Sequence, residues 1–422
     1  MDLLLRPIMP ESGRIGESAR MAAEITLILG AGQAGAHAAV AMRTAGLGGR
    51  VVLLGAEPHP PYDRPPLSKA ALTEDPEPSP GWFFPPERYA ALNIELLPGT
   101  AAEGIDLAAA RVALAGGRAF PYDRLLIATG GRARPLTVPG AERALTLRTL
   151  DDARALRARL APGARVVCIG AGVIGLEVAA SAHARGCRVT VLEAMPAALG
   201  RSMTWAMAEW LVGLHRRAGV TVHFDTSVTA IEPNAVVCAD GSHVPADVVL
   251  AGIGMTRNIG LASAAGLAVD NGIVVDECGR TSAAGVFAAG DVAAFWHPRL
   301  GRRLRLESWR HAQDHGIAVG RVMAGGTAPY DEVPWFWTDQ HGRNIQVAGL
   351  PGDAATTVLR GALTDASFCA FHLDAQGRVV AATGVDAPRE VRAAMALIRA
   401  GAMVDPARLA DPAVKPQALL PR

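Results

Sequence analysis

Two glycine-rich segments have the residue types and the spacing needed to bind the phosphates of a dinucleotide. They are GAGQAG at Gly30–Gly35 and GAGVIG at Gly170–Gly175. In a G-x-G-x-x-G turn the first glycine permits a tight bend, the second lets the backbone approach a pyrophosphate, and the third allows helix and strand to pack closely. A helix that begins in the turn adds free N–H groups and the positive end of its dipole. Each segment therefore predicts a phosphate-binding site.

An acidic residue follows each segment at the distance expected for a dinucleotide site. Glu57 and Glu193 lie about 20 residues further on, where a carboxylate accepts hydrogen bonds from a ribose diol. Glu193 would repel a 2′-phosphate, and Ala194–Pro196 directly after it contain no arginine that would attract one. NADH is therefore favoured over NADPH at the second segment, although Arg201 lies a little further on.

The elements around the two segments follow the same order. An apolar strand precedes each glycine turn, a helix follows it, and a second strand comes next. The predicted elements are Ile25–Leu29, a helix to Thr44 and Arg50–Leu54 in the first unit, and Arg165–Ile169, a helix to about Ala184 and Arg188–Leu192 in the second. Tyr122–Gly130 and Asp247–Gly254 then repeat a strand that runs into a glycine turn. The chain therefore contains an internal duplication of a nucleotide-binding unit.

The remaining segments complete the predicted organisation. Gly272–Asp276 and Gly285–Asp291 are expected as further strands, and beyond Pro329 the chain becomes aromatic and rich in strands. Strands are predicted there at Trp335–Trp337, Asn344–Val347, Thr356–Leu359 and Phe368–His372, and a helix at Arg389–Arg399. We predict an α/β fold with two Rossmann-like nucleotide-binding domains and a C-terminal α+β domain. The predicted limits are 1–22 for a disordered leader, 23–136 and 255–328 for a discontinuous first domain, 137–254 for the second and 329–422 for the third.

Composition excludes several classes of protein. A length of 422 residues indicates two or three domains, and a net charge of +1 argues against a nucleic-acid binder. The five cysteines are scattered and never spaced C-x-x-C, which argues against a disulfide framework, a zinc site or an iron–sulfur cluster. No stretch approaches the roughly 18 apolar residues of a membrane span. We expect a cytoplasmic protein that does not bind a membrane.

Several short motifs outside the two glycine-rich segments are specific enough to indicate a family. They are Pro65–Lys69, Ala128–Gly130, Gly175–Glu177, Ala289–Asp291, Glu307–Ala312 and Pro334–Gln340. These motifs resemble those of FAD-dependent NADH:ferredoxin reductases of bacterial oxygenase systems, which belong to the glutathione-reductase-like superfamily. The resemblance covers about residue 24 to at least Gly349 and is closest to the reductase components of aromatic-ring dioxygenases, with putidaredoxin reductase also similar. It implies FAD and NAD(H) as cofactors, with FAD in the first domain and NADH in the second.

The resemblance also implies roles for individual residues at the FAD site. Glu57 would hold the adenosine ribose alone, since Ala56 stands where the family often has another acid. Ala102 is expected near the adenine, Arg134 near the flavin, and Asp291 on the ribityl chain. The full set implied for FAD is Gly30, Gly32, Ala34, Gly35, Glu57, Arg64, Lys69, Ala102, Ala128, Thr129, Gly130, Arg134, Gly290, Asp291 and Trp309.

At the NADH site the implied residues are Gly170, Gly172, Val173, Ile174, Gly175, Glu193 and Gly254. Lys69, Glu177 and Trp309 are the implied catalytic residues. Lys69 is expected beside the reactive edge of the flavin, paired with Glu177, and Trp309 is expected to line the flavin. Trp337 is expected at the flavin edge that faces the electron acceptor. Core packing is the alternative interpretation of both tryptophans.

Lys69 has a physical argument of its own. It is one of only two lysines among 41 basic residues, the other being Lys415. An ammonium group next to a reduced flavin stabilises its negative charge, and a desolvated lysine needs a carboxylate partner such as Glu177. The alternative is a surface lysine that follows a Pro-Pro turn.

The cysteine pattern separates this chain from the disulfide-reducing members of the superfamily. Those relatives carry a redox-active cysteine pair beside the flavin, whereas here the first cysteine is Cys168 and Pro65–Lys69 contains none. A dithiol relay is therefore excluded at that position. Electrons are expected to leave the flavin directly, which suits a one-electron acceptor.

The expected electron acceptor is an acidic iron–sulfur ferredoxin. A group of arginines around Trp309 would attract such a ferredoxin. The alternative is that these arginines belong to an ordinary solvated strand. They are Arg299, Arg302, Arg303, Arg305 and Arg310. His311 and His315 are expected to be solvated or structural. The leading hypothesis is an NADH:ferredoxin reductase that feeds an oxygenase, as a monomer or weak homodimer. The alternatives are an NADH oxidase or disulfide reductase, a rubredoxin reductase, and a non-catalytic NAD-binding sensor.

Overall fold

The first glycine turn lies in a parallel sheet. The computed structural model describes residues 24–200 and 202–421, so the leader expected at residues 1–22 lies outside the described residues. The sheet has the order β18-β7-β1-β2-β3, with β1 (Ile25–Leu29) paired in parallel to both neighbours. The other strands are β2 (Arg50–Leu54), β3 (Ile94–Leu97), β7 (Arg124–Ile127) and β18 (Val286–Ala288). Because the chain leaves β1 for β2 on one side and reaches β7 on the other, the turn lies at a topological switch point, where such sheets bind ligands.

The second glycine turn lies in a sheet of the same design. Its order is β11-β10-β9-β15, and β9 (Arg165–Ile169) again has parallel partners on both sides. The others are β10 (Arg188–Leu192), β11 (Thr221–His223) and β15 (Val248–Ala251), with helices α6 (Val173–Ala184) and α7 (Trp205–Ala218). An antiparallel meander precedes β7 in the first unit and β15 in the second. The strands of the first meander are β4 (Ala102–Asp106), β5 (Arg111–Leu114) and β6 (Ala119–Pro121), and those of the second are β12 (Val228–Ile231), β13 (Ala235–Cys238) and β14 (His243–Pro245). The predicted duplication is therefore present in the topology.

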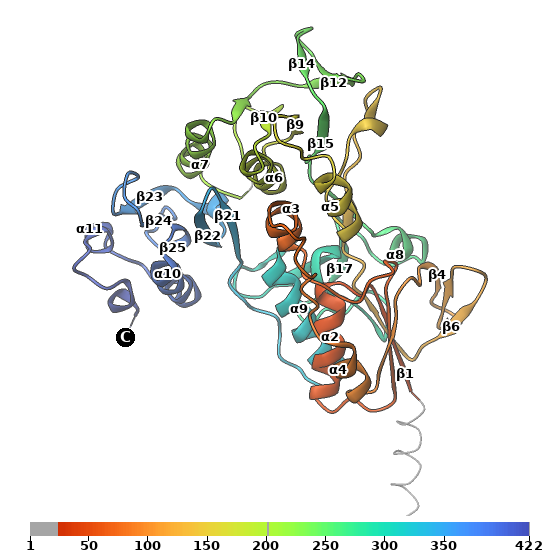
Figure 1. Cartoon of the computed structure of the whole chain (residues 1–422). Coiled ribbons are helices and arrows are strands. Elements are labelled where there is room, and N and C mark those ends of the chain that lie inside the picture. The colour runs from red at the N-terminus through yellow and green to blue at the C-terminus, as the bar shows by residue number, and fades with distance from the viewer. Residues whose placement is uncertain (1–23, 201, 422) are drawn as a thin grey trace, which may run out of the picture.

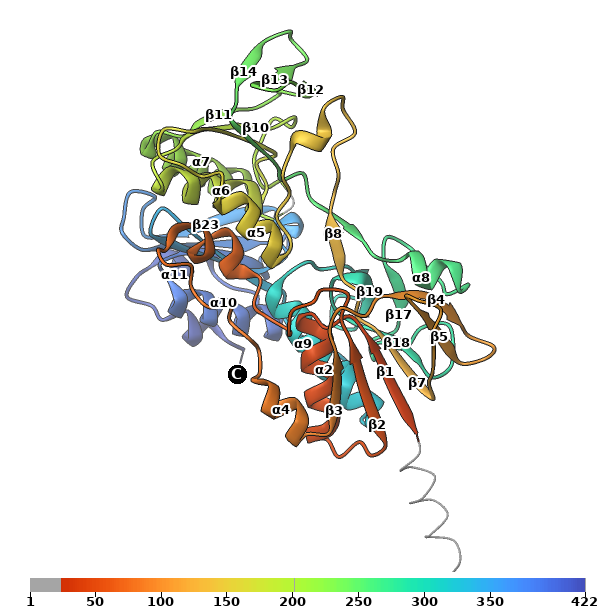
Figure 2. The ribbon, with the colours of Figure 1, turned by 45° about the vertical axis from the view of Figure 1, so that its right-hand side comes forward.

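Two helices from distant parts of the chain lie against each other beside the first sheet. α2 (Gln33–Thr44) runs alongside α9 (Trp309–Met323), as both ribbon views show (Figure 1, Figure 2). A Cβ added at Gly316 would lie 2.3 Å from the carbonyl oxygen of Ala34, and one at Gly320 would lie 2.6 Å from that of Ala38. The glycines of α9 thus allow close contact with α2. This contact places the start of α9, and with it Trp309, next to the first glycine turn.

The C-terminal unit is an antiparallel sheet with the order β21-β22-β25-β24-β23. Its strands are β21 (Trp335–Gln340), β22 (Arg343–Gly349), β23 (Thr356–Arg360), β24 (Phe368–Leu373) and β25 (Val379–Val385), with helices α10 (Pro388–Ala400) and α11 (Pro406–Ala410). α10 packs on one face of this sheet around Phe371 and Leu397. Ile345 and Phe368, on the other face, share a buried cluster with Leu176 of α6. The sheet is thereby fixed against the second unit (Figure 1).

Shorter elements connect these units. The strands β8 (Gly131–Ala133) and β16 (Met255–Arg257) form an antiparallel pair that joins the first unit to the second (Figure 2). The rest are η1 (Pro65–Ser68), α3 (Ala70–Thr73), α4 (Pro86–Ala91), η2 (Ala141–Arg143), α5 (Leu150–Arg157), α8 (Gly260–Ala264), β17 (Ile273–Val275), η3 (Gly290–Val292), β19 (Ala293–His297), β20 (Arg302–Leu304), η4 (Pro351–Asp353) and η5 (Pro416–Leu419). Within the described part of the chain, none of the helices combines the length and the apolar character that crossing a bilayer requires.

The predicted fold class, α/β with a C-terminal α+β unit, is confirmed. The predicted C-terminal strands fall within β21 to β24, each observed strand being longer by one to three residues. The strand expected over Gly285–Asp291, with its end at the Gly-Asp corner, is present as β18, whose last residue is Ala288. Gly290 has φ +77°, which turns the chain into η3 and brings Asp291 towards the first glycine turn.

Candidate active site

A cavity of about 1520 Å³ lies between the first and second units. Both glycine turns line it, together with η1, β8 and the start of α9, while Phe336 and Trp337 close one side from the C-terminal sheet. This volume exceeds the roughly 300–1,000 Å³ typical of a site for one small ligand. The cavity therefore has room for more than one cofactor-sized molecule.

The first glycine turn has the geometry of a phosphate cradle. Gly30 has φ +110°, and a Cβ there would lie 2.3 Å from the carbonyl oxygen of Ala128. A Cβ on Gly35 would lie 1.9 Å from the carbonyl oxygen of Gly30, which explains why helix and strand need glycine at this point. A Cβ on Gly32 would meet no described protein atom within 4 Å. Packing within the described chain therefore does not require glycine at position 32. A phosphate group that approaches the N-terminus of α2 does require glycine there, because a side chain would block its approach.

The second turn repeats these features. Gly170 has φ +100°, and a Cβ there would lie 2.7 Å from the carbonyl oxygen of Gly252. A Cβ on Gly175 would lie 2.0 Å from the carbonyl oxygen of Gly170, as in the first turn. Gly172 has more room, since its Cβ would lie 3.8 Å from the oxygen of Gly252. The 12-residue helix α6 begins directly after it, so both turns present a helix N-terminus to the same cavity.

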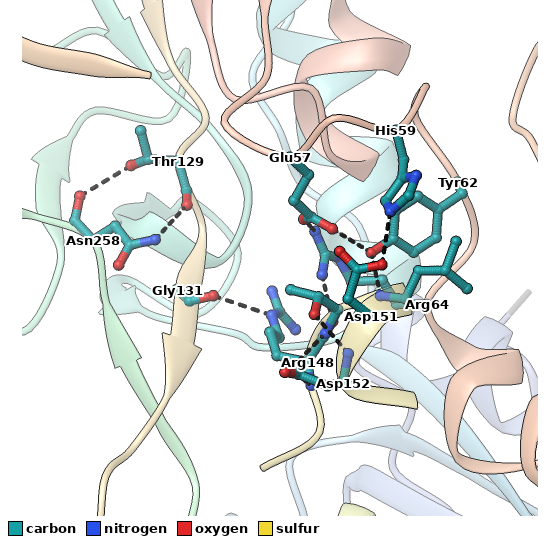
Figure 3. Close-up of polar contacts among 12 residues, drawn as sticks. Glu57, His59, Tyr62, Arg64, Thr129, Gly131, Arg148, Asp151, Asp152 and Asn258 are labelled. Atoms are coloured by element: carbon teal, nitrogen blue, oxygen red, sulfur yellow. Dashed lines mark hydrogen bonds and ion pairs between the residues drawn. The ribbon is translucent and has the colours of Figure 1, made fainter. Parts of the chain in front are cut away.

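The two predicted ribose-binding acids are held differently. Glu193 accepts backbone hydrogen bonds from Ala171, at 2.7 Å, and from Met195, at 2.9 Å. Glu57 is held by side chains, accepting from the hydroxyl of Tyr62 and from Arg64 Nη2 at 2.6 Å (Figure 3). Burial raises the pKa of Tyr62, so its hydroxyl stays protonated and donates to Glu57. Glu193 is thereby fixed by its own turn, whereas the position of Glu57 depends on its side-chain partners.

Asp291 and Arg148 form a pair on the cavity wall. Arg148 Nη2 lies 3.2 Å from Asp291 Oδ2. The Nε atom of Arg148 donates to the carbonyl oxygen of Gly131 at 3.1 Å (Figure 3). Burial raises the pKa of Asp291 and lowers that of Arg148. Asp291 Oδ1 is buried and has no hydrogen-bond partner among the described residues. A buried acceptor without a partner is costly, so this oxygen fits a donor supplied by a bound molecule.

Arg148 is a cavity residue that the sequence motifs did not indicate. Its backbone N–H donates to Asp152 Oδ2 at 2.9 Å, and Asp152 forms a capping box with Thr149 at the start of α5. The T-x-x-D spacing at Thr149 is the sequence signal that marks this helix start. No local sequence pattern predicts that Arg148 pairs with Asp291, which lies 143 residues away in the chain.

Lys69 and Glu177 lie together between the two glycine turns. Lys69 Nζ is 2.8 Å from Glu177 Oε1, and the Glu177 side chain is only 3% exposed. Glu177 also accepts hydrogen bonds from the hydroxyls of Ser68 and Thr338, the latter at 2.6 Å. Three donors thus surround one buried carboxylate, which keeps it charged at low cost.

Aromatic side chains also line the cavity. Trp309 donates from its indole N–H to Asp63 at 2.6 Å, and its ring meets Trp337 edge to face at 5.6 Å. Trp337 in turn stacks on Trp335 at 5.3 Å. Both Trp309 and Trp337 line the cavity, so neither is purely a core residue.

Most of the predicted site residues lie on the wall of this cavity. They are Gly30, Gly32, Ala34, Glu57, Arg64, Lys69, Ala128, Thr129, Gly130, Arg134, Gly170, Gly172, Val173, Ile174, Glu177, Glu193, Gly254, Asp291 and Trp309. Within the described chain, the wall does not include Gly35, Gly175, Gly290 or Ala102. Gly35 and Gly175 pack helix against strand, and Gly290 is bent against Ala34. Ala102 instead packs beside the core beneath the first sheet.

The predicted basic patch is largely neutralised within the protein. Four of its arginines have carboxylate partners: Arg299 with Asp331, Arg302 with Asp353, Arg305 with Glu307 and Arg310 with Asp314. Arg303 donates to the backbone carbonyls of Val275 and Ala294. His311 and His315 are buried at 3% and 0% exposure, so of the two expected roles the structural one holds.

The cysteines lie away from this chemistry. All five are free and buried, and the cavity wall contains none of them in the described chain. Nor do the described residues contain a cluster of histidine, cysteine or acidic side chains that could hold a metal ion.

Comparison with known proteins gives consistent results. Residues 25–316 match the pyridine nucleotide-disulphide oxidoreductase family and residues 335–420 match a reductase C-terminal domain. The chain is 42% identical to the ferredoxin–NAD(+) reductase component of the anthranilate 1,2-dioxygenase system of Burkholderia cepacia, over 93% of this chain and 98% of that protein. It is 38% identical to putidaredoxin reductase of Pseudomonas putida, over 92% and 94%. Its structure is similar to that of a ferredoxin reductase from Rhodopseudomonas palustris, with a TM-score of 0.91 at 36% identity, covering 94% of this chain and all (100%) of that one.

Proposed function

The chain belongs to the pyridine nucleotide-disulphide oxidoreductase family, and from this premise we propose that it is an FAD-dependent NADH:ferredoxin oxidoreductase that supplies electrons to an oxygenase. One observation carries the proposal. Two phosphate cradles open on the same cavity, with the Lys69–Glu177 pair between them and no cysteine on the wall in the described chain. Relatives that match this chain over 98% and 96% of their own length are ferredoxin–NAD(+) reductase components of dioxygenase systems.

The first cradle suits FAD. When bound, FAD accepts a hydride from NADH and gives up electrons one at a time. We assign the pyrophosphate to Gly30–Gly35 and the start of α2, and the adenosine ribose to Glu57. Asp291 Oδ1, buried without a partner among the described residues, would accept a hydrogen bond from the ribityl chain, while Arg148 holds Asp291 in place.

The second cradle suits NADH. Gly172 leaves the backbone open to the pyrophosphate, and Glu193 presents its carboxylate to the ribose diol. The two backbone hydrogen bonds from Ala171 and Met195 fix this carboxylate where it would repel a 2′-phosphate.

Lys69, Glu177 and Trp309 would act where the two cofactors meet. The ammonium group of Lys69 stabilises the negative charge that reduction places on the flavin. Glu177 balances that ammonium in a dry environment, since its carboxylate is buried. The Trp309 ring covers the cavity wall on the first unit and excludes water.

The electron acceptor that the relatives support is a ferredoxin. We propose that it docks near Trp337 and Trp335, which extend from the cavity wall in edge-to-face and stacked contact. Because the nearby arginines already have partners, attraction of an acidic ferredoxin would depend on these ion pairs opening.

The finer predictions fit within this function. We propose the domain limits 23–136 with 255–328 for FAD, 137–254 for NADH and 329–422 for the C-terminal unit. We also propose a cytoplasmic monomer or weak homodimer. Size-exclusion chromatography with light scattering measures the oligomeric state directly, and a tight dimer would contradict this prediction.

The test of the function is NADH-dependent cytochrome c reduction by the purified holoprotein, with and without added ferredoxin. We expect a yellow protein that reduces cytochrome c rapidly only when ferredoxin is present and that prefers NADH to NADPH. A colourless protein would contradict the FAD assignment. Fast turnover with oxygen or a disulfide, independent of ferredoxin, would instead indicate an oxidase or disulfide reductase.

A further inference from the structure

The carboxylate of Glu177 has a second line of partners that leads away from Lys69. Its Oε1 atom, which contacts Lys69 Nζ at 2.8 Å, also accepts from Thr338 Oγ1 at 2.6 Å. Thr338 Oγ1 accepts from Gln340 Nε2 at 2.8 Å, and Gln340 Oε1 lies 2.6 Å from Nε2 of His215. His215 Nδ1 is 3.0 Å from Nε2 of His341. We call Thr338, Gln340, His215 and His341 the Glu177 chain.

The direction of every hydrogen bond in the Glu177 chain follows from the negative charge of the Glu177 carboxylate, to which Thr338 is bonded. An ionised carboxylate only accepts, so Thr338 must donate to it and must itself accept from the amide nitrogen of Gln340. The amide oxygen of Gln340 then faces His215, whose Nε2 must carry the proton. Nδ1 of a neutral His215 is left to accept from His341.

The environment of His215 agrees with this arrangement. Burial lowers the pKa of His215 to about 4, so the ring is neutral near pH 7, as the chain requires. Each donor therefore points towards Glu177, and aligned hydrogen bonds of this kind strengthen one another.

Together with Lys69 and Glu177, the Glu177 chain joins three separate parts of the fold. Lys69 follows η1 of the first unit, whereas Glu177 and His215 belong to helices α6 and α7 of the second. Thr338 and Gln340 occupy alternate positions on β21, so they face the same side of the C-terminal sheet. Thr338, Gln340 and His215 are 0%, 2% and 0% exposed. Apolar side chains at these three positions would commonly be as stable or more so, which indicates that the polar groups serve the carboxylate.

We propose that Thr338, Gln340 and His215 are positioning residues for the Lys69–Glu177 pair, which fix the carboxylate oxygen that contacts the ammonium group. This inference rests on the proposed function, in that the flavin is the group next to Lys69. It assigns the C-terminal unit a part in setting the reduction potential of the flavin, separate from any docking of a partner.

The test uses the midpoint potential of the bound flavin, measured by dye equilibration in the holoprotein. In Thr338→Val the buried carboxylate loses the donor that fixes Oε1, so this oxygen moves away from Lys69 Nζ. The ammonium group then faces the reduced flavin with less of its counter-charge, so the potential becomes more positive. Thr338→Ser keeps the hydroxyl and is expected to restore the wild-type potential.

Two comparisons separate positioning from general disturbance of the fold. Glu177→Gln is expected to shift the potential in the same direction, and adding Thr338→Val to it should produce no further shift, because the group on which Thr338 acts is gone. Thr383→Val is the matched control. Thr383 is equally buried in the same sheet and bonds to His372 rather than to Glu177, so its loss should leave the potential unchanged.

An unchanged potential in Thr338→Val would overturn the proposal, as would an undiminished shift in the Glu177→Gln background or an equal shift in Thr383→Val. If Thr338→Val fails to fold or to hold flavin, His215→Phe tests the chain from its other end, with the buried His372→Phe as control. The measurement needs neither NADH nor ferredoxin. Failure of ferredoxin reduction would therefore contradict the proposed function and leave this result standing.

Discussion

At the scale of single residues, Lys69 is the one whose charge matters most to the proposed chemistry. We expect Lys69→Met to slow reduction of the flavin by NADH by about 10–100-fold, since a nearby positive charge that stabilises the product is worth about 1.4–3 kcal/mol. The dissociation constant for NADH should change little. Anaerobic stopped-flow measurement of the flavin absorbance gives both quantities.

The same variant leaves Glu177 buried without its cation, which should lower the stability of the protein as well. Lys69→Met combined with Glu177→Gln is therefore expected to regain stability while flavin reduction stays slow. Lys415→Met is the matched control, because Lys415 is the other lysine of the chain and is exposed. Equal slowing in the Lys415 variant would show that the rate does not depend on the position of the charge.

Glu193 sets the expected choice of nicotinamide cofactor. Glu193→Gln keeps the size of the side chain and an oxygen for one of the two backbone donors, Ala171 or Met195, and it removes the charge that repels a 2′-phosphate. We expect the ratio of kcat/KM for NADH over that for NADPH to fall about tenfold, equivalent to about 1.4 kcal/mol. The flavin content should stay as in the wild type. An unchanged ratio would mean that another group discriminates between the two cofactors.

At the scale of elements, two glycines of the first turn have different roles: Gly35 is needed for folding and Gly32 for cofactor binding. A Cβ at Gly35 would lie 1.9 Å from a backbone oxygen, so Gly35→Ala is expected to force β1 and α2 apart and to lower the yield of folded protein. In Gly32→Ala the Cβ meets no described protein atom within 4 Å, so the apoprotein should fold normally. Its affinity for FAD should nevertheless fall at least tenfold, because the methyl group occupies the path of the pyrophosphate.

Circular dichroism of the two apoproteins and titration with FAD distinguish these outcomes. If Gly32→Ala binds FAD as tightly as the wild type, the pyrophosphate does not approach that residue. If instead both variants fold equally well, the close packing of α2 against β1 is not what requires Gly35.

The sequence predicted those features whose residues lie close together along the chain, and it did not predict contacts between distant residues. The two glycine turns and their flanking strands were predictable because strand, turn and helix follow one another within about 30 residues. The meander β4–β6 was not predicted, since its strands are short and only Val112 and Leu114 of β5 are fully buried. Lys69 and Glu177 could be paired only through the family resemblance, because they lie far apart in the chain. Nothing local linked Arg148 to Asp291 or Thr338 to Glu177.

At the scale of the whole molecule, the cavity exists because three units meet. The first and second units contribute one glycine turn each, and β21 closes the space between them. Polar contacts that cross such interfaces keep the units in register, since a buried donor on one unit has its acceptor on another. The Glu177 chain and the Arg148–Asp291 pair both do this.

The stability of the whole molecule should therefore depend on pH through its buried histidines. Burial lowers the pKa of His215 and of His372 to about 4 and that of His315 to about 3, from an ordinary value of 6.5. Below pH 6.5 the unfolded chain binds protons at these sites and the folded protein does not. Stability is therefore fully present above this pH and is lost as the pH falls towards the folded pKa.

Each of these histidines should cost about 1 kcal/mol of unfolding free energy between about pH 7 and pH 5.5, a range in which carboxylates contribute little. We expect the holoprotein to lose at least about 3 kcal/mol over this range, measured by urea unfolding, because burial also lowers the pKa of His311. His372→Phe should reduce that loss by about 1 kcal/mol, whatever its effect at neutral pH, because one proton-binding site is removed from the unfolded chain. A loss equal to that of the wild type in His372→Phe would show that His372 binds its proton in the folded state as readily as in the unfolded one.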